Sequence, residues 1–198
     1  MRGSWVLAAV VGLALAAGDA RADIAAGDAA YNRGDYATAL AEWTPLAEAG
    51  DAEAQFDVAS MYQIGQGVPQ DYAEAVRWFR LAADQGHAMA QISLALMYDD
   101  GLGVAQDYAE AVRWWRLAAD QGVAVAQGNL ALLYALGRGV PRDYITAHMW
   151  ANIAGANGNK DAPDVRDRIA AKMTPAAIAE AQRRAKGCRA SSYTRCDN

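Results

Sequence analysis

The chain has few of the residues that build catalytic or metal sites. Its 198 residues include only two histidines and two cysteines, and His87 and His148 have no cysteine nearby. Neither a Ser-x-x-Lys nor a His-Glu-x-x-His motif occurs. A structural zinc site needs four ligands, and a hydrolytic site needs a nucleophile with its base. We therefore expect no enzyme activity, no metal site and no cofactor.

Positive charge is also scarce. Lysine and arginine total 18 against 23 aspartates and glutamates, which gives a net charge of −5. The chain has no stripe of basic residues, and proteins that bind nucleic acids usually have one. We expect no nucleic-acid partner.

Long hydrophobic runs are absent except near the start. Trp5 to Ala17 is an apolar run of about 13 residues, which is shorter than the roughly 20 that a membrane-spanning helix needs. Arg2 precedes it, and the small-x-small site Ala20-Arg21-Ala22 follows. This order predicts a secretory signal peptide over residues 1–22, cleaved after Ala22, and a periplasmic or secreted bacterial protein. The alternative is an uncleaved membrane anchor.

Both cysteines, Cys188 and Cys196, lie near the C-terminus. In an exported protein such a pair is expected to form a disulfide. A metal site is the weaker alternative, because no histidine lies beside the two thiols.

The chain repeats itself with a period of about 36 residues. Segments 71–106 and 107–142 agree at about 25 of 36 positions, a weaker copy covers 35–70, and a partial one covers 143–158. A unit of this size cannot bury its own apolar face, so neighbouring units must stack. Stacking produces a long surface rather than one pocket. Such a surface favours binding of an extended partner over catalysis.

Each unit reads as two helices. In segment 71–106, Asp71 and Glu74 have the spacing of a capping box, whereas Asp35 and Asp143 have threonine at the third position and predict weaker helix starts. Gly86 is expected to end the first helix. Glycine pairs such as Gly101 and Gly103 close each unit; a phosphate-binding loop would need a preceding strand and a third glycine.

Two units in tandem carry the same detailed motif, which is similar to the Sel-one-like repeat family of the tetratricopeptide superfamily. The residues that carry the resemblance are Ala75, Trp78, Ala82, Ala83, Gly86, Ala90, Leu94, Tyr98, Gly101, Gly103, Val104 and Asp107, with their equivalents 36 residues later. In the first unit Glu42 occupies the tryptophan position and Trp43 follows it. The resemblance implies an all-α, right-handed α-solenoid over residues 23–158 with a tetratricopeptide-like N-terminal hairpin.

Beyond the repeats, residues 159–187 are expected to form C-terminal capping helices. Thr174-Pro175 predicts a helix start and Gly187 predicts its end. Residues 188–198 are expected to form a polar tail.

The resemblance further implies an adaptor that holds a protein partner on the concave face, which is lined by the first helix of each pair. On this chain the expected contacts are Trp43, Phe79, Trp115, Arg77, Arg80, Arg113 and Arg116, because aromatic and arginine side chains dominate binding hot spots. In the alternative interpretation, the aromatic rings fill seams between repeats and the arginines are solvated or pair with Asp84 and Asp120.

Two other functions stay open at this point. Tryptophan and tyrosine on a curved face could stack on an envelope glycan or polysaccharide. Some cysteine-rich relatives are associated with penicillin binding and weak β-lactamase activity, but they carry a cysteine pair in nearly every repeat, and this chain carries none there. An exposed terminal repeat can also self-associate weakly.

Overall fold

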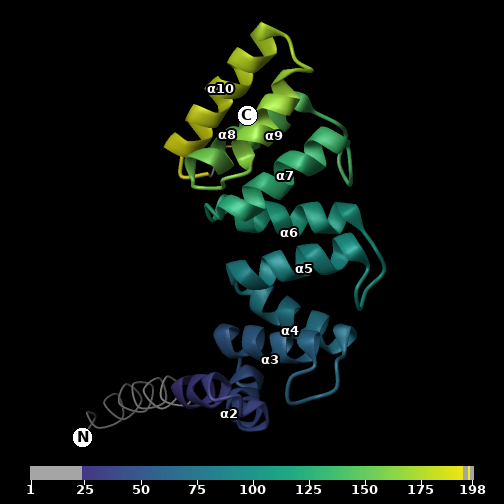
Figure 1. Cartoon of the computed structure of the whole chain (residues 1–198), viewed down its shortest axis with the longest axis vertical. Coiled ribbons are helices and arrows are strands. Elements are labelled where there is room, and N and C mark those ends of the chain that lie inside the picture. The colour runs from purple at the N-terminus through teal and green to yellow at the C-terminus, as the bar shows by residue number, and fades with distance from the viewer. Residues whose placement is uncertain (1–23, 194–195, 197–198) are drawn as a thin grey trace, which may run out of the picture. The chain divides into compact units, whose positions relative to one another are not determined.

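The computed structural model describes residues 24–193 and 196, so the signal peptide predicted over residues 1–22 lies outside the described residues. Within that part of the chain every regular element is an α-helix and there is no strand (Figure 1). Consecutive helices pack in pairs, as in a helical-repeat solenoid, and the expected all-α fold is confirmed. None of the helices described is long and apolar enough to cross a membrane.

The chain forms two compact units, divided between Gln85 and Gly86. In the first, residues 24–32 are helical, and α3 packs against both α2 and α4. The bounds are α2 Tyr36–Glu48, α3 Ala52–Ile64 and α4 Tyr72–Asp84.

In the second unit α5, α6, α7 and α8 each pack against the next, and α8 also contacts both C-terminal helices, α9 and α10. The bounds are α5 Ala88–Asp100, α6 Tyr108–Asp120, α7 Ala124–Leu136, α8 Tyr144–Ala156, α9 Ala162–Ala170 and α10 Pro175–Ala190.

The first helices begin at the aspartates that the sequence indicates. The Asp71 carboxylate accepts hydrogen bonds from the backbone N–H groups of Ala73 and Glu74, at 2.9 and 3.0 Å. The Asp143 carboxylate accepts from two backbone N–H groups and, at 2.7 Å, from the Thr146 hydroxyl. Although burial opposes the change, the Thr146 hydrogen bonds lower the pKa of Asp143. The helix start that was expected to be weaker is therefore well capped.

The glycine pairs are structural. Gly137 ends α7 in the left-handed conformation, with φ of 71°. At Gly139 an added Cβ would lie 2.2 Å from the Tyr108 carbonyl oxygen, so the loop can approach α6 only because this residue has no side chain.

Buried glutamines on the second helices join neighbouring helices, a feature that the sequence analysis did not identify. Gln127 is fully buried; its Nε2 donates to the Ala119 carbonyl at 3.0 Å, and its Oε1 accepts from Asn157 Nδ2 at 2.9 Å. In the first unit, Gln55 makes the same two bonds with Ala47 and Gln85, at 3.0 and 2.8 Å. Their signal in the sequence is a glutamine that recurs every 36 residues, at 55, 91 and 127.

The C-terminus differs from the expectation in one respect. Helix α10 continues through Gly187 to Ala190, so Gly187 does not end it and the first part of the supposed polar tail is helical. A disulfide joins Cys188 to Cys196. Between them, the Tyr193 hydroxyl accepts a hydrogen bond from Asn157 Nδ2 at 2.7 Å, which links this segment to the buried Gln127.

Candidate protein-binding surface

The three aromatic side chains expected at a partner surface lie in the interior. Trp43, Phe79 and Trp115 have exposed fractions of 3%, 0% and 2%. Phe79 packs against Phe56 of the neighbouring helix, with ring centroids 5.7 Å apart. These rings fill seams between helices, as the alternative interpretation had it, and do not form an exposed aromatic surface.

Arg77 and Arg113 are exposed but make local contacts. Arg77 pairs with Glu74 at 2.5 Å, and its guanidinium lies 4.2 Å from the centroid of the Trp78 ring. Arg113 repeats this arrangement in the second unit with Glu110, at 2.6 Å, and stacks on the adjacent tryptophan ring. The ion-pair partners of Arg77 and Arg113 are thus glutamates one turn earlier on the same helix. These arginines cover indole rings as well as facing solvent.

The other two arginines differ from each other. Arg116 Nη2 donates to the Tyr134 hydroxyl at 3.1 Å, and its guanidinium lies 5.1 Å from the Trp150 ring centroid. Arg116 therefore holds α6 to its neighbours. Arg80 is exposed on α4.

The exposed apolar side chains of the second unit lie mostly on its second helices rather than its first. Leu96 on α5 and Leu132 on α7 occupy equivalent repeat positions and are 44% and 41% exposed. The exposed large apolar residues of α5 and α7 are Met89, Leu96, Val125, Leu132 and Leu136.

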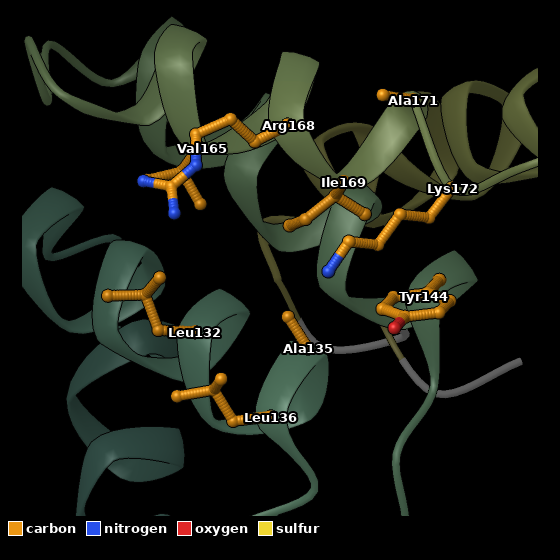
Figure 2. A pocket seen from close by; sticks show the side chains of 9 residues that line it. All are labelled: Leu132, Ala135, Leu136, Tyr144, Val165, Arg168, Ile169, Ala171 and Lys172. Carbon is orange, nitrogen blue, oxygen red and sulfur yellow. The ribbon is translucent and has the colours of Figure 1, made fainter.

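One part of this surface is hollowed into a groove of about 360 Å³, here called the α7–α9 groove. Figure 2 shows Leu132, Ala135 and Leu136 on α7, with Val165 and Ile169 of α9 across from them. The groove is lined by Leu132, Ala135, Leu136, Tyr144, Val165, Arg168, Ile169, Ala171 and Lys172.

The groove has a basic edge. Arg168 and Lys172 are both exposed at and beyond the end of α9, and Figure 2 shows the Lys172 side chain extending toward Tyr144. The Lys172 ammonium lies 5.7 Å from the Tyr144 ring centroid, and the Arg142 guanidinium lies 5.6 Å from the same ring. Three cations therefore flank an apolar floor.

A smaller hollow of about 210 Å³ shares Leu132 and Val165 with the groove. It extends the same α7–α9 seam past Asn129 and Asn159, whose amide nitrogens donate to the Val125 and Ala124 carbonyls. The seam thus offers a length of apolar surface with polar groups at one end and cations at the other.

The residues expected at a partner surface all lie on the first helix of each repeat, whereas this groove is formed by α7, a second helix, and by α9. Leu132 and Leu136 are four residues apart on one helix face, and Arg168 and Lys172 have the same spacing. What the sequence does not show is that α9 lies against α7 and so brings the two pairs together.

The structure shows no cluster that would hold a metal ion among residues 24–193 and 196. His148 is buried, with an exposed fraction of 2%, and burial, together with the nearby Arg166, lowers its pKa.

The sequence and fold were compared with known proteins. The Sel1 repeat family model matches residues 52–87, 88–123 and 124–159, together more than half of the chain. Comparison with curated proteins gave no match.

Two crystal structures are similar. A Sel1 repeat protein from Oxalobacter formigenes is 31% identical with a TM-score of 0.67, over 70% of this chain and 57% of that one. A protective antigen present in uropathogenic Escherichia coli strains, which displays an SLR fold, is 38% identical with a TM-score of 0.69, over 75% of this chain and 32% of that one. The chain thus spans less than two thirds of either protein. With three matched repeats and this fold, the chain belongs to the Sel1 repeat family.

Proposed function

We propose that this protein is a non-enzymatic scaffold that holds a protein partner in the α7–α9 groove. Sel1 repeat proteins generally mediate protein–protein interactions, and the fold supplies helix faces rather than an enclosed pocket. The observation that carries the proposal is the groove itself, in which exposed leucines lie beside cations.

The chemistry of the groove defines the partner segment. Leu132 and Leu136 are 41% and 59% exposed, and covering them would remove apolar surface from water. Arg168 and Lys172 at the edge would attract carboxylates, although the chain as a whole is acidic. The occupant is an acidic amphipathic helix with apolar residues three or four positions apart.

The test is a selection of random 16-residue peptides against the full chain. We expect the enriched peptides to be acidic, with apolar residues at helical spacing. Their affinity should fall about tenfold or more with Leu132→Asp and with the double change Arg168→Glu, Lys172→Glu.

The repeat provides matched controls. Leu96→Asp alters the equivalent, equally exposed leucine on α5, which does not line the groove. Lys186→Glu removes a cation from α10, outside the groove. Both should leave peptide binding unchanged. Basic peptides, or binding that the groove variants do not weaken, would contradict the proposal.

The proposal also places the protein in the bacterial periplasm. The pattern of residues 1–22 supports export, and the Cys188–Cys196 disulfide suits an oxidising compartment. Cell fractionation and N-terminal sequencing test this: the mature protein should begin at Asp23. A chain that retains Met1 and sediments with membranes would favour the uncleaved anchor.

The earlier alternatives give distinct outcomes in an affinity capture from the envelope fraction. A protein partner lost in the Leu132→Asp variant but kept in Leu96→Asp supports the groove. Loss with Arg80→Glu or Arg113→Glu instead would assign binding to the first helices. Retention of glycan alone would favour a polysaccharide-binding protein, and saturable nitrocefin hydrolysis would contradict the non-enzymatic assignment.

A further inference from the structure

A second cavity lies in the first unit, and it is lined by acidic residues where the α7–α9 groove is lined by basic ones. It holds about 310 Å³ between helical residues 24–32, α2 and α3, at the lower end of the size range of ligand pockets. Its walls combine aromatic rings with carboxylates, and none of the described residues that line it is basic. The lining residues are Asp28, Tyr31, Asn32, Trp43, Phe56, Asp57, Ser60, Met61 and Ile64.

The aromatic wall is built by packing between helices. The Tyr31 and Trp43 rings lie with centroids 5.7 Å apart, and the Trp43 indole N–H donates to the Ile24 carbonyl at 3.4 Å. Phe56 packs against Phe79 of α4, with ring centroids 5.7 Å apart. Rings held in this way present surfaces that attract a cation.

The charged groups that act on Asp57 are other carboxylates. Asp57 lies on α3, and the charged groups that act on it are Glu53 on the same helix, Asp51 at its start and Asp28 from residues 24–32. All of them are acidic. Burial first, and then these three carboxylates, raise the pKa of Asp57 to about 7.

The repeat shows that the fold does not require this carboxylate. The positions equivalent to Asp57, 36 and 72 residues later, are Ser93 and Asn129. Those equivalent to Glu53 are Met89 and Val125. A half-buried carboxylate carries a desolvation penalty that serine and asparagine avoid in the same framework.

We propose that this cavity binds the positively charged side chain of an arginine or lysine in a second protein, with Asp57 and Asp28 pairing with the charge and Tyr31 and Phe56 contacting the stem. A guanidinium suits the site best, because it stacks on rings and pairs with carboxylates through its planar fork. A hydrated metal ion suits it less well, because such ions take six or more oxygen ligands. The site shares no lining residue with the α7–α9 groove and takes the opposite charge, so it does not depend on the scaffold proposal.

The test titrates the full chain with N-acetyl-arginine amide and with N-acetyl-citrulline amide, which has the same shape without the charge. Calorimetry and nitrogen-15 NMR report binding. We expect saturable binding of the arginine compound, shifts centred on Ser60 and Ile64, and affinity for the citrulline compound at least about tenfold lower.

Variants assign the charge to the cavity. Asp57→Asn and, separately, Asp28→Asn should each weaken arginine binding, by about tenfold for Asp57. Asp84→Asn removes the same charge from an exposed position on α4 outside the cavity and should have no effect. Asparagine at position 57 should fold, since Asn129 occupies the equivalent position.

Proton exchange gives an independent readout. Binding a cation favours the ionised form of Asp57, so near pH 6.5 the wild type should release protons on binding and Asp57→Asn should release fewer. Equal binding of citrulline, equal weakening by Asp84→Asn, no saturable binding, or calcium binding that depends on Asp57 without arginine binding would each overturn the proposal.

Discussion

Gly27 and Trp43 are in such close contact that residue 27 has no room for a side chain. A Cβ built on Gly27 would lie 2.2 Å from the indole Nε1 of Trp43, which donates to the Ile24 carbonyl one turn earlier. The close approach brings helical residues 24–32 onto α2 and forms one wall of the cavity that contains Asp57.

Gly27→Ala should therefore destabilise the protein although alanine favours helices. The added methyl group must displace a buried indole, and overpacking of this kind costs about 1–3 kcal/mol. Urea unfolding followed by circular dichroism measures the change. Gly187→Ala is the control: Gly187 is also helical, nothing lies within 4 Å of its added Cβ, and there alanine should stabilise by about 0.5–1 kcal/mol. Effects of the same sign would contradict the steric account.

Gln127→Ala should lower the free energy of unfolding by about 1–3 kcal/mol, because it removes two buried hydrogen bonds, one to the Ala119 carbonyl and one from the Asn157 amide. Chemical denaturation compared with wild type gives the value. The same change at Gln182, which is exposed on α10, should have little effect. A small loss at both positions would show that the buried bonds contribute little.

Reduction of the Cys188–Cys196 disulfide should lower the melting temperature. The loop is short, with a separation of 8 residues, and on a chain-entropy estimate the bond contributes roughly 2–3 kcal/mol. Thermal unfolding with and without a reductant measures it. A Cys188→Ala, Cys196→Ala variant should melt at the lower temperature in both conditions, and Tyr193→Phe should then cost less than in the oxidised wild type.

Asp57 should make stability depend on pH in a defined direction. Its folded pKa of about 7 lies above the ordinary aspartate value of 3.8, so between these values the folded state binds more protons than the unfolded state. Its contribution is complete below the lower value and is lost as the pH rises through the upper one. The free energy of unfolding of Asp57→Asn, measured from pH 4 to 8, should therefore decline less with rising pH than that of wild type. His148 acts in the opposite direction, since its lowered pKa favours folding as the pH rises, and it is present in both proteins.

The fold could be predicted almost completely from local chemistry. Aspartate caps such as Asp71, and glycines such as Gly137, mark the helix ends in each unit, and the 36-residue period indicates how units pair. The exception is Gly187, where the chain continues as a helix through Ala190. A glycine permits a helix end but does not require one.

The binding surface could not be predicted in the same way, because residue type does not determine exposure. Trp115 and Arg113 are near neighbours on α6, yet the tryptophan is 2% exposed and the arginine lies on the surface. Trp115→Ala is consequently expected to destabilise the fold, by about 3–5 kcal/mol, rather than to remove a contact selectively. The α7–α9 groove depends on contact between helices separated along the chain, which no single repeat reveals.

The hydrogen bonds of the buried glutamines can be formed whatever the number of repeats. Gln127 takes one partner from 8 residues earlier and the other from 30 residues later, and Gln55 does the same in the first unit. Every bond of the pattern closes within a stretch little longer than one period. Excising or duplicating a block of 36 residues would leave each remaining glutamine with partners of the same kind. Copy number can therefore change in whole steps of 36 residues while each buried glutamine in the interior stays hydrogen-bonded.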